Sequence, residues 1–258
     1  MDVNSRYKKI IIPDNNDIKI FIVGDIHGRY SILKKTLEYA GYNENKDYLF
    51  ATGDLIDRGT ENVEVLKYMT EHSRRFTVLG NHEDMIVEPF SYEMWVMNGG
   101  FYTLNNLDEK GLSIDWLREK INKFPYLIDV SSSLGNFRVT HSEIPSGMTE
   151  EIFQESLLDN CSTIWNTILW GRREAQVFQD YEIINFNVNQ IYVERMEEQI
   201  LKFYENLRKG NMMENFCGHN ILVDPLFLPN RTYLDLGMED MCIFDYGDRI
   251  AYRYSDIK

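Results

Sequence analysis

Three short apolar runs divide the first eighty residues of the chain. They are Ile18–Val23, Tyr48–Thr52 and Phe76–Leu79, and polar, glycine-containing turns follow them. Short apolar runs bounded by turn residues are typical of buried strands. We therefore predict three β-strands here.

Amphipathic segments separate these runs. The first begins near Ser31, a candidate N-cap, and ends at Gly41, with leucines at helical spacing between them. The second is Asn62–His72, which places Val63 and Leu66 on one face. The resulting β-α-β-α-β order predicts a parallel sheet with right-handed crossovers.

The rest of the chain is helical in the middle and returns to strands. We predict helices at Glu83–Asn98, at Ser113–Asn122 and along an apolar stripe from Val193 to Leu207 that ends at Gly210, and strands at Tyr126–Val130, Phe137–Thr140, Asn215–Cys217, Thr232–Leu236, Met241–Tyr246 and Ile250–Tyr254. Residues 176–190 show no clear period. Trp165, Trp170 and the methionine-rich segment Met85–Met97 are predicted to be core. With no repeat or low-complexity linker, residues 1–258 are predicted to form one domain.

Composition restricts the partners and the compartment. The net charge of -14 makes nucleic-acid polymers and anionic membranes poor partners, so an anionic substrate would need locally concentrated positive charge. The three cysteines include no CxxC pair, residues 1–17 lack the apolar core of a signal peptide, and no apolar run is long enough for a bilayer. We therefore expect a cytoplasmic protein.

Polar side chains follow the predicted strands in short motifs. These motifs are Gly24-Asp25-Ile26-His27-Gly28, Gly53-Asp54-Leu55-Ile56-Asp57-Arg58-Gly59 and Gly80-Asn81-His82-Glu83, with His141 and His219 after later strands. Ligands of open α/β sheets bind beyond the carboxyl ends of the strands. Asp25, His27, Asp54, Asn81 and His82 should therefore converge. The fifth histidine, His72, is expected to be structural or solvated.

The residue types in these motifs favour metal binding. Carboxylate, imidazole and amide donors without a thiolate suit Mn, Fe or Zn. Asp25 and His27 can reach one cation from an extended segment, and Asp54 can bridge two. Two ions about 3.5–4 Å apart can hold a phosphoryl group in line. A lone motif would usually be a turn, but three in order predict a dinuclear site.

These motifs resemble the calcineurin-like metallophosphoesterase superfamily. Within it, the chain is most similar to the phosphoprotein-phosphatase branch, and particularly to the bacteriophage lambda type of Ser/Thr protein phosphatase. The similarity extends from about Ile18 to the C-terminus and includes Glu61-Asn62-Val63-Glu64, Asn98-Gly99-Gly100, Phe124-Pro125-Tyr126, Trp170-Gly171-Arg172 and Leu234-Asp235-Leu236-Gly237. It implies an α/β (α+β) fold, a four-layer α/β/β/α sandwich with a dinuclear metal site at the strand ends.

The resemblance also implies a role for each site residue. Two divalent metal ions are expected, Mn first, with Fe, Zn or Ni as alternatives. The implied ligands are Asp25, His27 and Asp54 for the first ion and Asp54, Asn81, His141 and His219 for the second. His82 would be the general acid, oriented by Asp57. Arg58, Arg172 and Asn81 would bind the phosphate.

The implied reaction is direct hydrolysis of a phosphomonoester. A hydroxide that bridges the metals would attack phosphorus in line, without a phosphoenzyme. The implied substrate is a phosphorylated protein, on serine or threonine, or a small phosphoester. The resemblance leaves the oligomeric state open.

Several departures from the family pattern leave alternatives. Leu79 replaces an arginine common in the protein phosphatases, which points to diadenosine tetraphosphate hydrolysis or cyclic-nucleotide phosphodiesterase activity instead. His141-Ser142-Glu143 replaces His-Ala-Gly or His-Ala-Asp, and Gly218-His219-Asn220 replaces Gly-His-Thr, without loss of a ligand. A long span before His219 predicts a helical insertion around residues 177–208, which is either a helix packed on the domain or a lid or partner surface. A metal-binding module without turnover is a third alternative, and nuclease activity is disfavoured by the charge.

Overall fold

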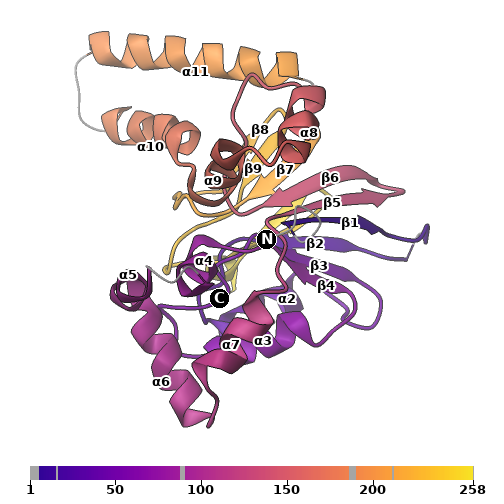
Figure 1. The fold of residues 1–258 in the computed structure, drawn as a ribbon. Coiled ribbons are helices and arrows are strands. Elements are labelled where there is room, and N and C mark those ends of the chain that lie inside the picture. Colours follow the sequence, from indigo (N-terminus) through magenta and orange to yellow (C-terminus); the bar gives the residue numbers. More distant parts are fainter. Residues whose placement is uncertain (1–5, 16, 88–90, 186–189, 211, 258) are drawn as a thin grey trace.

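The computed structural model describes residues 6–15, 17–87, 91–185, 190–210 and 212–257, with only the backbone described for 180–185 and 190–196. Within these residues two β-sheets are stacked between layers of helices (Figure 1). The strands are β1 (Tyr7–Ile11), β2 (Ile20–Val23), β3 (Tyr48–Ala51), β4 (Arg75–Thr77), β5 (Leu127–Ser132), β6 (Gly135–Thr140), β7 (Glu214–Cys217), β8 (Leu226–Leu228), β9 (Arg231–Tyr233), β10 (Cys242–Asp245) and β11 (Ile250–Arg253). The helices are α2 (Tyr30–Tyr39), α3 (Asn62–Thr70), α4 (Asn81–Val87), α5 (Tyr92–Trp95), the π-helical turn η1 (Val96–Gly100), α6 (Phe101–Glu109), α7 (Ile114–Ile121), α8 (Glu150–Leu158), α9 (Ser162–Trp170), α10 (Arg173–Asn185), α11 (Gln190–Gly210) and the 3₁₀ turn η2 (Tyr254–Asp256).

The two sheets have distinct strand orders. One has the order β11-β10-β2-β3-β4 and contains the parallel β2, β3 and β4 that the sequence predicts. The other has the order β1-β5-β6-β7-β9-β8. In the parallel strands the carboxyl ends meet at one edge, and this edge holds the first three motifs.

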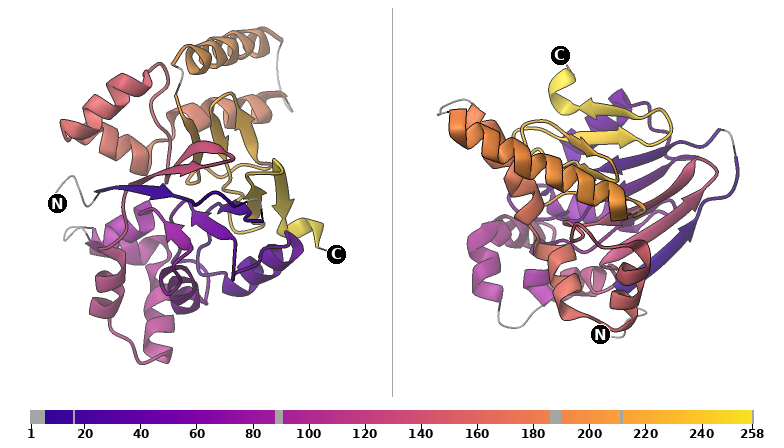
Figure 2. Two further views of the ribbon diagram at one scale, coloured as in Figure 1. Left: turned by 90° about the vertical axis from the view of Figure 1, so that its right-hand side faces the viewer. Right: turned by 90° about the horizontal axis from the view of Figure 1, so that it is seen from above.

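Successive side chains of a strand point to opposite faces of its sheet, and this alternation explains the four layers. In β2, Phe21 and Val23 pack with Leu33 and Leu37 of α2, whereas Ile20 and Ile22 join the core between the sheets. On the far side, Phe203 and Leu207 of α11 cover the six-stranded sheet. Figures 1 and 2 show α10 and α11 on one side of the paired sheets and α2, α3, α6 and α7 on the other. The predicted α/β/β/α sandwich is therefore confirmed.

Two strands and one cap differ from the sequence prediction. β1 was not predicted, because its two lysines hide an edge strand that pairs in parallel with β5. The short strand β8 was also missed. Ser31 is not an N-cap: α2 begins at Tyr30, and the Ser31 hydroxyl donates to the carboxylate of Glu61 instead. The predicted helix Ser113–Asn122 corresponds to α7, and Ser113 is its N-cap, since the side-chain oxygen accepts a hydrogen bond from the backbone N–H of Trp116.

The predicted helix Glu83–Asn98 is wrong as a single element. The sequence has a proline at position 89, which a helix interior disfavours, and residues 88–90 lie outside the described ones. α4 ends at Val87, α5 is a single turn, and η1 leads into α6, which was not predicted. Gly99, at a φ of 111°, produces the kink inside η1.

Residues 145–213 are more helical than predicted. α8, α9 and α10 were missed, whereas α11 follows the predicted apolar stripe. α10 and α11 lie side by side, with the rings of Phe178 and Phe203 5.5 Å apart (Figure 1). The predicted insertion around residues 177–208 falls on this pair, and its status as an insertion stays a prediction. Among the described residues, no helix combines the length and the apolar character needed to cross a membrane.

Candidate dinuclear metal site

The ends of five strands bring the predicted site residues together. Asp25 and His27 follow β2, Asp54 and Asp57 follow β3, Asn81 and His82 follow β4 at the start of α4, His141 follows β6, and His219 follows β7. All eight side chains are at most 5% exposed. Both sheets therefore contribute to one buried polar centre.

One group of donors surrounds His141. Its Nε2 lies 2.8 Å from Oδ1 of Asn81 and 3.1 Å from Nδ1 of His219, and these last two atoms are 2.9 Å apart. Oδ1 of Asp54 is 3.5 Å from the same Nε2. These four side chains are the ligand set that the resemblance implies for the second metal.

The hydrogen-bond roles in this group leave lone pairs facing one another. Nδ1 of His141 lies 2.8 Å from the carbonyl of Thr52, which can only accept, so the ring proton is on Nδ1 and Nε2 is a bare acceptor. It faces the Asn81 oxygen, another acceptor. Burial lowers the pKa of both imidazoles, that of His219 to about 2, and Nε2 of His219 has no partner among the described residues. A cation fits this set of converging neutral donors.

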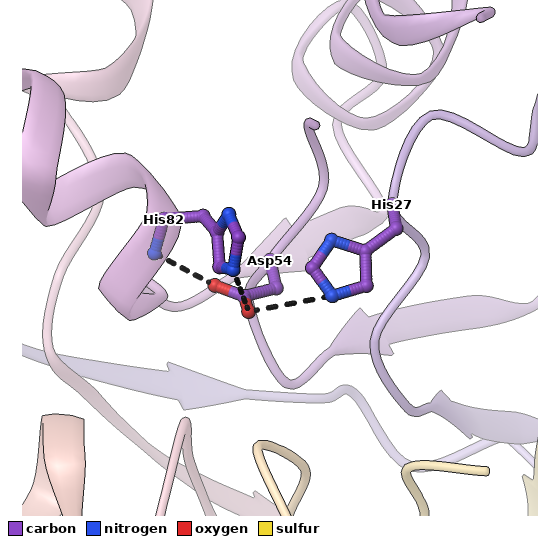
Figure 3. Close-up of side chains that lie close together, drawn as sticks. All are labelled: His27, Asp54 and His82. Atoms are coloured by element: carbon purple, nitrogen blue, oxygen red, sulfur yellow. Dashed lines mark hydrogen bonds and ion pairs between the residues drawn. The ribbon is translucent and has the colours of Figure 1, made fainter. Parts of the chain in front are cut away.

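A second group surrounds the other oxygen of Asp54. Oδ2 lies 3.6 Å from Nε2 of His27 and 3.8 Å from Nε2 of His82 (Figure 3). Nδ1 of His27 donates to the carbonyl of Ile56 at 2.9 Å, and burial lowers the pKa of this histidine to about 3. Because Asp54 has one oxygen toward each group, its position suits a bridging carboxylate.

The centre also has an excess of buried negative charge. Burial, with the charges of Asp235 and Asp54, raises the pKa of Asp25 well above its usual value. Burial would raise the pKa of Asp54 too, but the surrounding imidazoles hold it below its usual value. Donor atoms of Asp25, Asp54 and His141 all lie within 4.8 Å of one another. Buried carboxylates need countercharges, which divalent ions would supply.

His82 and Asp57 form a dyad beside Asp54. Nδ1 of His82 donates to Oδ2 of Asp57 at 2.7 Å. Burial works against protonation of His82, but the charge of Asp54 and the bond to Asp57 outweigh it and raise the pKa. The donor atoms of His27, Asp54 and His82 are also close enough to share an ion. The geometry therefore allows His82 to be either a proton donor or a ligand.

The two arginines approach the centre from different sides. The guanidinium of Arg58 donates to Nε2 of His27 at 2.8 Å and to Nε2 of His82 at 2.9 Å. Arg172 is exposed and donates to the backbone carbonyl of His219 at 3.1 Å. Two guanidinium groups thus lie at the edge of the centre, where both could bind one phosphate group.

The site loops have unusual backbone conformations. In the described part of the chain seven non-glycine residues have positive φ, and five of them belong to the site: His27, Asp54, Asp57, Arg58 and His219. Each such residue costs on the order of 1–3 kcal/mol, and such strain clusters at functional sites. Gly53 is needed where it stands, because its φ is 98° and a Cβ would lie 2.8 Å from the backbone of Gly80.

Several residues that support the site were not assigned a role from sequence. The carboxylate of Glu83 accepts hydrogen bonds from the backbone N–H groups of Asp54, Leu55 and Gly80, and burial with the nearby Asp54 charge raises its pKa to about 8. Its place in the Gly80-Asn81-His82-Glu83 motif was the available signal. Trp95 donates to Asp57, although it was predicted only as core.

Three of the residues that depart from the family pattern, Ser142, Glu143 and Asn220, contact one turn. The Ser142 hydroxyl and Nδ2 of Asn220, the latter at 3.2 Å, both donate to the carbonyl of Gly171. The Glu143 carboxylate accepts from the backbone N–H groups of Glu174 and Ala175. The Ser142 hydroxyl is thus buried and bonded to the backbone of this turn. All three side chains fix the turn that carries Arg172.

Other predictions for single residues had mixed outcomes. His72 lies outside the site, where its Nδ1 accepts from the backbone N–H of Arg74. Trp165 is buried as predicted, but Trp170 is 39% exposed and its ring lies edge-on to His219 at 6.3 Å. Leu79 packs in the core on the helix side of the five-stranded sheet. In the methionine-rich segment, Met85 is buried whereas Met97 is 88% exposed, so the core prediction holds only in part.

Comparison with known proteins agrees with this geometry. The model of the family described as calcineurin-like phosphoesterase matches residues 18–207. The chain belongs to this family. It is therefore a metallophosphoesterase, a hydrolase with a dinuclear metal-dependent fold, and the residues gathered here include candidate metal ligands.

Individual known proteins are similar to this chain to different extents. The chain is 31% identical over 190 residues to serine/threonine-protein phosphatase 2 of Escherichia coli strain K12, which covers 71% of this chain and 81% of the relative. It is 32% identical over 119 residues to a symmetrical bis(5'-nucleosyl)-tetraphosphatase of Coxiella burnetii strain Dugway 5J108-111, covering 45% of this chain and 40% of that one. A serine/threonine phosphatase structure from Saccharomyces cerevisiae has a TM-score of 0.57 at 15% identity, covering 92% and 76% of the two chains. That likeness shows the shared fold.

Proposed function

We propose that the chain is a metal-dependent phosphomonoesterase that removes phosphate from serine or threonine of phosphoproteins. The observation that carries this proposal is the convergence of side-chain nitrogen and oxygen atoms of His141, Asn81 and His219 on one point beside Asp54. Asp25, His27 and Asp54 would hold the first ion, and Asp54 would be shared with the second. Mn is our first choice for both ions, and the cytoplasm is the proposed compartment.

Two divalent ions at these positions would polarise phosphoryl oxygens and make water more acidic. Arg58, Arg172 and the amide of Asn81 would bind the remaining phosphate oxygens. Guanidinium is suited to this task because it stays charged and binds oxyanions through paired N–H groups. Charge that develops on phosphate in the transition state is thereby stabilised.

His82 supplies the proton that the leaving oxygen needs. Its raised pKa favours a proton on Nε2, whereas the contact with Arg58 requires a lone pair there. The two are compatible once Arg58 turns away from His82, as phosphate binding requires. Asp57 then holds Nδ1 and stabilises the imidazolium.

Different observations favour two different substrate classes. The long match to a serine/threonine phosphatase favours phosphoproteins. Leu79 and the shorter match to a tetraphosphatase favour dinucleoside polyphosphates as the second candidate. The Leu79 side chain is buried in the apolar core, so no cation is supplied from that position.

A direct contest between substrates tests this proposal. With Mn supplied, we expect kcat/KM for a phosphoserine peptide to exceed that for diadenosine tetraphosphate, with phosphate release followed for both. Much higher kcat/KM for the dinucleotide would make the second candidate the function. Arg172→Ala provides a matched variant, because it should lower kcat/KM for both substrates if both bind at the same phosphate site.

A further inference from the structure

Asp57, the partner of the proton donor, is held by two side chains from the α5–α6 segment. Nε1 of Trp95 donates to the two carboxylate oxygens at 3.1 and 2.8 Å. The hydroxyl of Thr103 donates to Oδ1 at 2.5 Å and accepts from the backbone N–H of Asp57 at 3.1 Å. Trp95, Thr103 and Asp57 are fully buried.

These bonds fix the direction of the carboxylate. Oδ2 receives the bond from His82 and one from Trp95, while Oδ1 receives bonds from Trp95 and Thr103. A buried carboxylate bonded on both oxygens cannot rotate without leaving a donor unpaired, which costs about 1–3 kcal/mol for each. The hydrogen bond from Nδ1 to Asp57 in turn fixes the orientation of the His82 imidazole.

The Asn98-Gly99-Gly100 motif explains how Trp95 and Thr103 reach the same side chain. A Cβ on Gly100 would lie 2.5 Å from the Trp95 ring, so only glycine allows the turn to fold back over it. The Gly99 carbonyl accepts from the backbone N–H of Arg58 at 3.3 Å, and a Cβ there would lie 2.9 Å from the Arg58 side chain. The turn therefore packs against both the dyad and the arginine.

We propose that Trp95 and Thr103 are positioning residues for the proton donor His82 and act through Asp57. The proposal rests on the proposed phosphomonoesterase function. As water forms its bond to phosphorus and the ester P–O bond breaks, the proton on Nε2 of His82 goes to the leaving oxygen. An alkyl oxygen needs this proton much more than a nitrophenoxide does, since nitrophenoxide is a stable anion. Loss of the positioning bonds should therefore affect alkyl phosphates selectively.

Trp95→Phe tests the indole bond, because it removes Nε1 and keeps a ring against Gly100. We expect kcat for a phosphoserine peptide to fall about tenfold, as a partial loss of the 10²–10⁴-fold typical of general acids. For p-nitrophenyl phosphate we expect a fall of less than about threefold, because the leaving group needs little proton transfer. Metal content should be unchanged.

The control for this variant is Trp165→Phe. Trp165 is also buried, but its Nε1 has no hydrogen-bond partner within the described residues. The variant therefore measures the effect of lost ring packing alone. We expect equal, small effects on both substrates. Thr103→Val and Thr103→Ser form a second pair: valine removes the hydroxyl and should show the same split, whereas serine restores it.

The outcomes separate this inference from the proposed function. Equal losses on both substrates in Trp95→Phe and Thr103→Val, or no loss in either, would overturn the positioning role. Should Trp95→Phe fail to fold, the threonine pair decides. If Mn-loaded wild type hydrolyses neither substrate, the proposed function fails first.

Discussion

His82→Asn is expected to lower kcat for a phosphoserine peptide by about 10²–10⁴-fold, the usual contribution of a general acid, while both metal ions stay bound. Asparagine can still accept from Arg58 or bond to Asp57, but it cannot carry the proton. For p-nitrophenyl phosphate, kcat of the same variant should fall much less. Steady-state kinetics on the two substrates, with metal content measured in parallel, check this expectation.

This variant also decides between the two roles that the geometry allows His82. Nε2 is 3.8 Å from Oδ2 of Asp54, close enough for a shared ion. Loss of one metal equivalent in His82→Asn, with similar losses on both substrates, would show that His82 is a ligand. Because Nδ1 is already bonded to Asp57, we expect the proton-donor outcome.

Asp54→Asn should abolish measurable phosphate release, because metal-ion catalysis needs both ions held together. Asp54 faces His141 with one oxygen and His27 with the other. The substitution replaces a bridging anion by a neutral amide whose N–H₂ group would point at one set of lone pairs. We expect loss of at least one metal equivalent by elemental analysis, with the circular dichroism of the fold retained.

Asp245→Asn is the matched control for that variant. Asp245 is also buried, but it pairs with Lys19 and lies at the end of β10 away from the motifs. It should keep its metals and its activity. Full activity in Asp54→Asn, or equal loss in Asp245→Asn, would contradict the bridging role.

The sequence pattern predicted the part of the site that follows β2, β3 and β4, because strand ends are local features. A short apolar run followed by Gly-Asp or Gly-Asn marks the carboxyl end of a parallel strand, and parallel topology then brings Asp25, Asp54 and Asn81 together. His141 and His219 come from the second sheet. Their place beside the first three depends on sheet packing, which the family resemblance supplied rather than the pattern itself.

Other features could not be read from local pattern. β1 is stabilised by pairing with β5, some 120 residues away, so its two lysines concealed it. The bond from Trp95 to Asp57 depends on the kinked turn at Gly99, and nothing in the periodicity of the segment distinguishes this indole from a packing residue. The role of Ser142 and Asn220 could not be predicted from sequence either, because it depends on the fold that brings both side chains to the Gly171 carbonyl.

The most direct test of the dinuclear site is metal removal and return. Chelated wild-type protein should release no phosphate from p-nitrophenyl phosphate, and activity should return in proportion to bound metal as Mn, Ni, Mg or Zn is added separately, up to two equivalents for each chain. We expect Mn to restore the most activity. Full activity in metal-free protein, or none with two equivalents of any of these ions bound, would contradict the account.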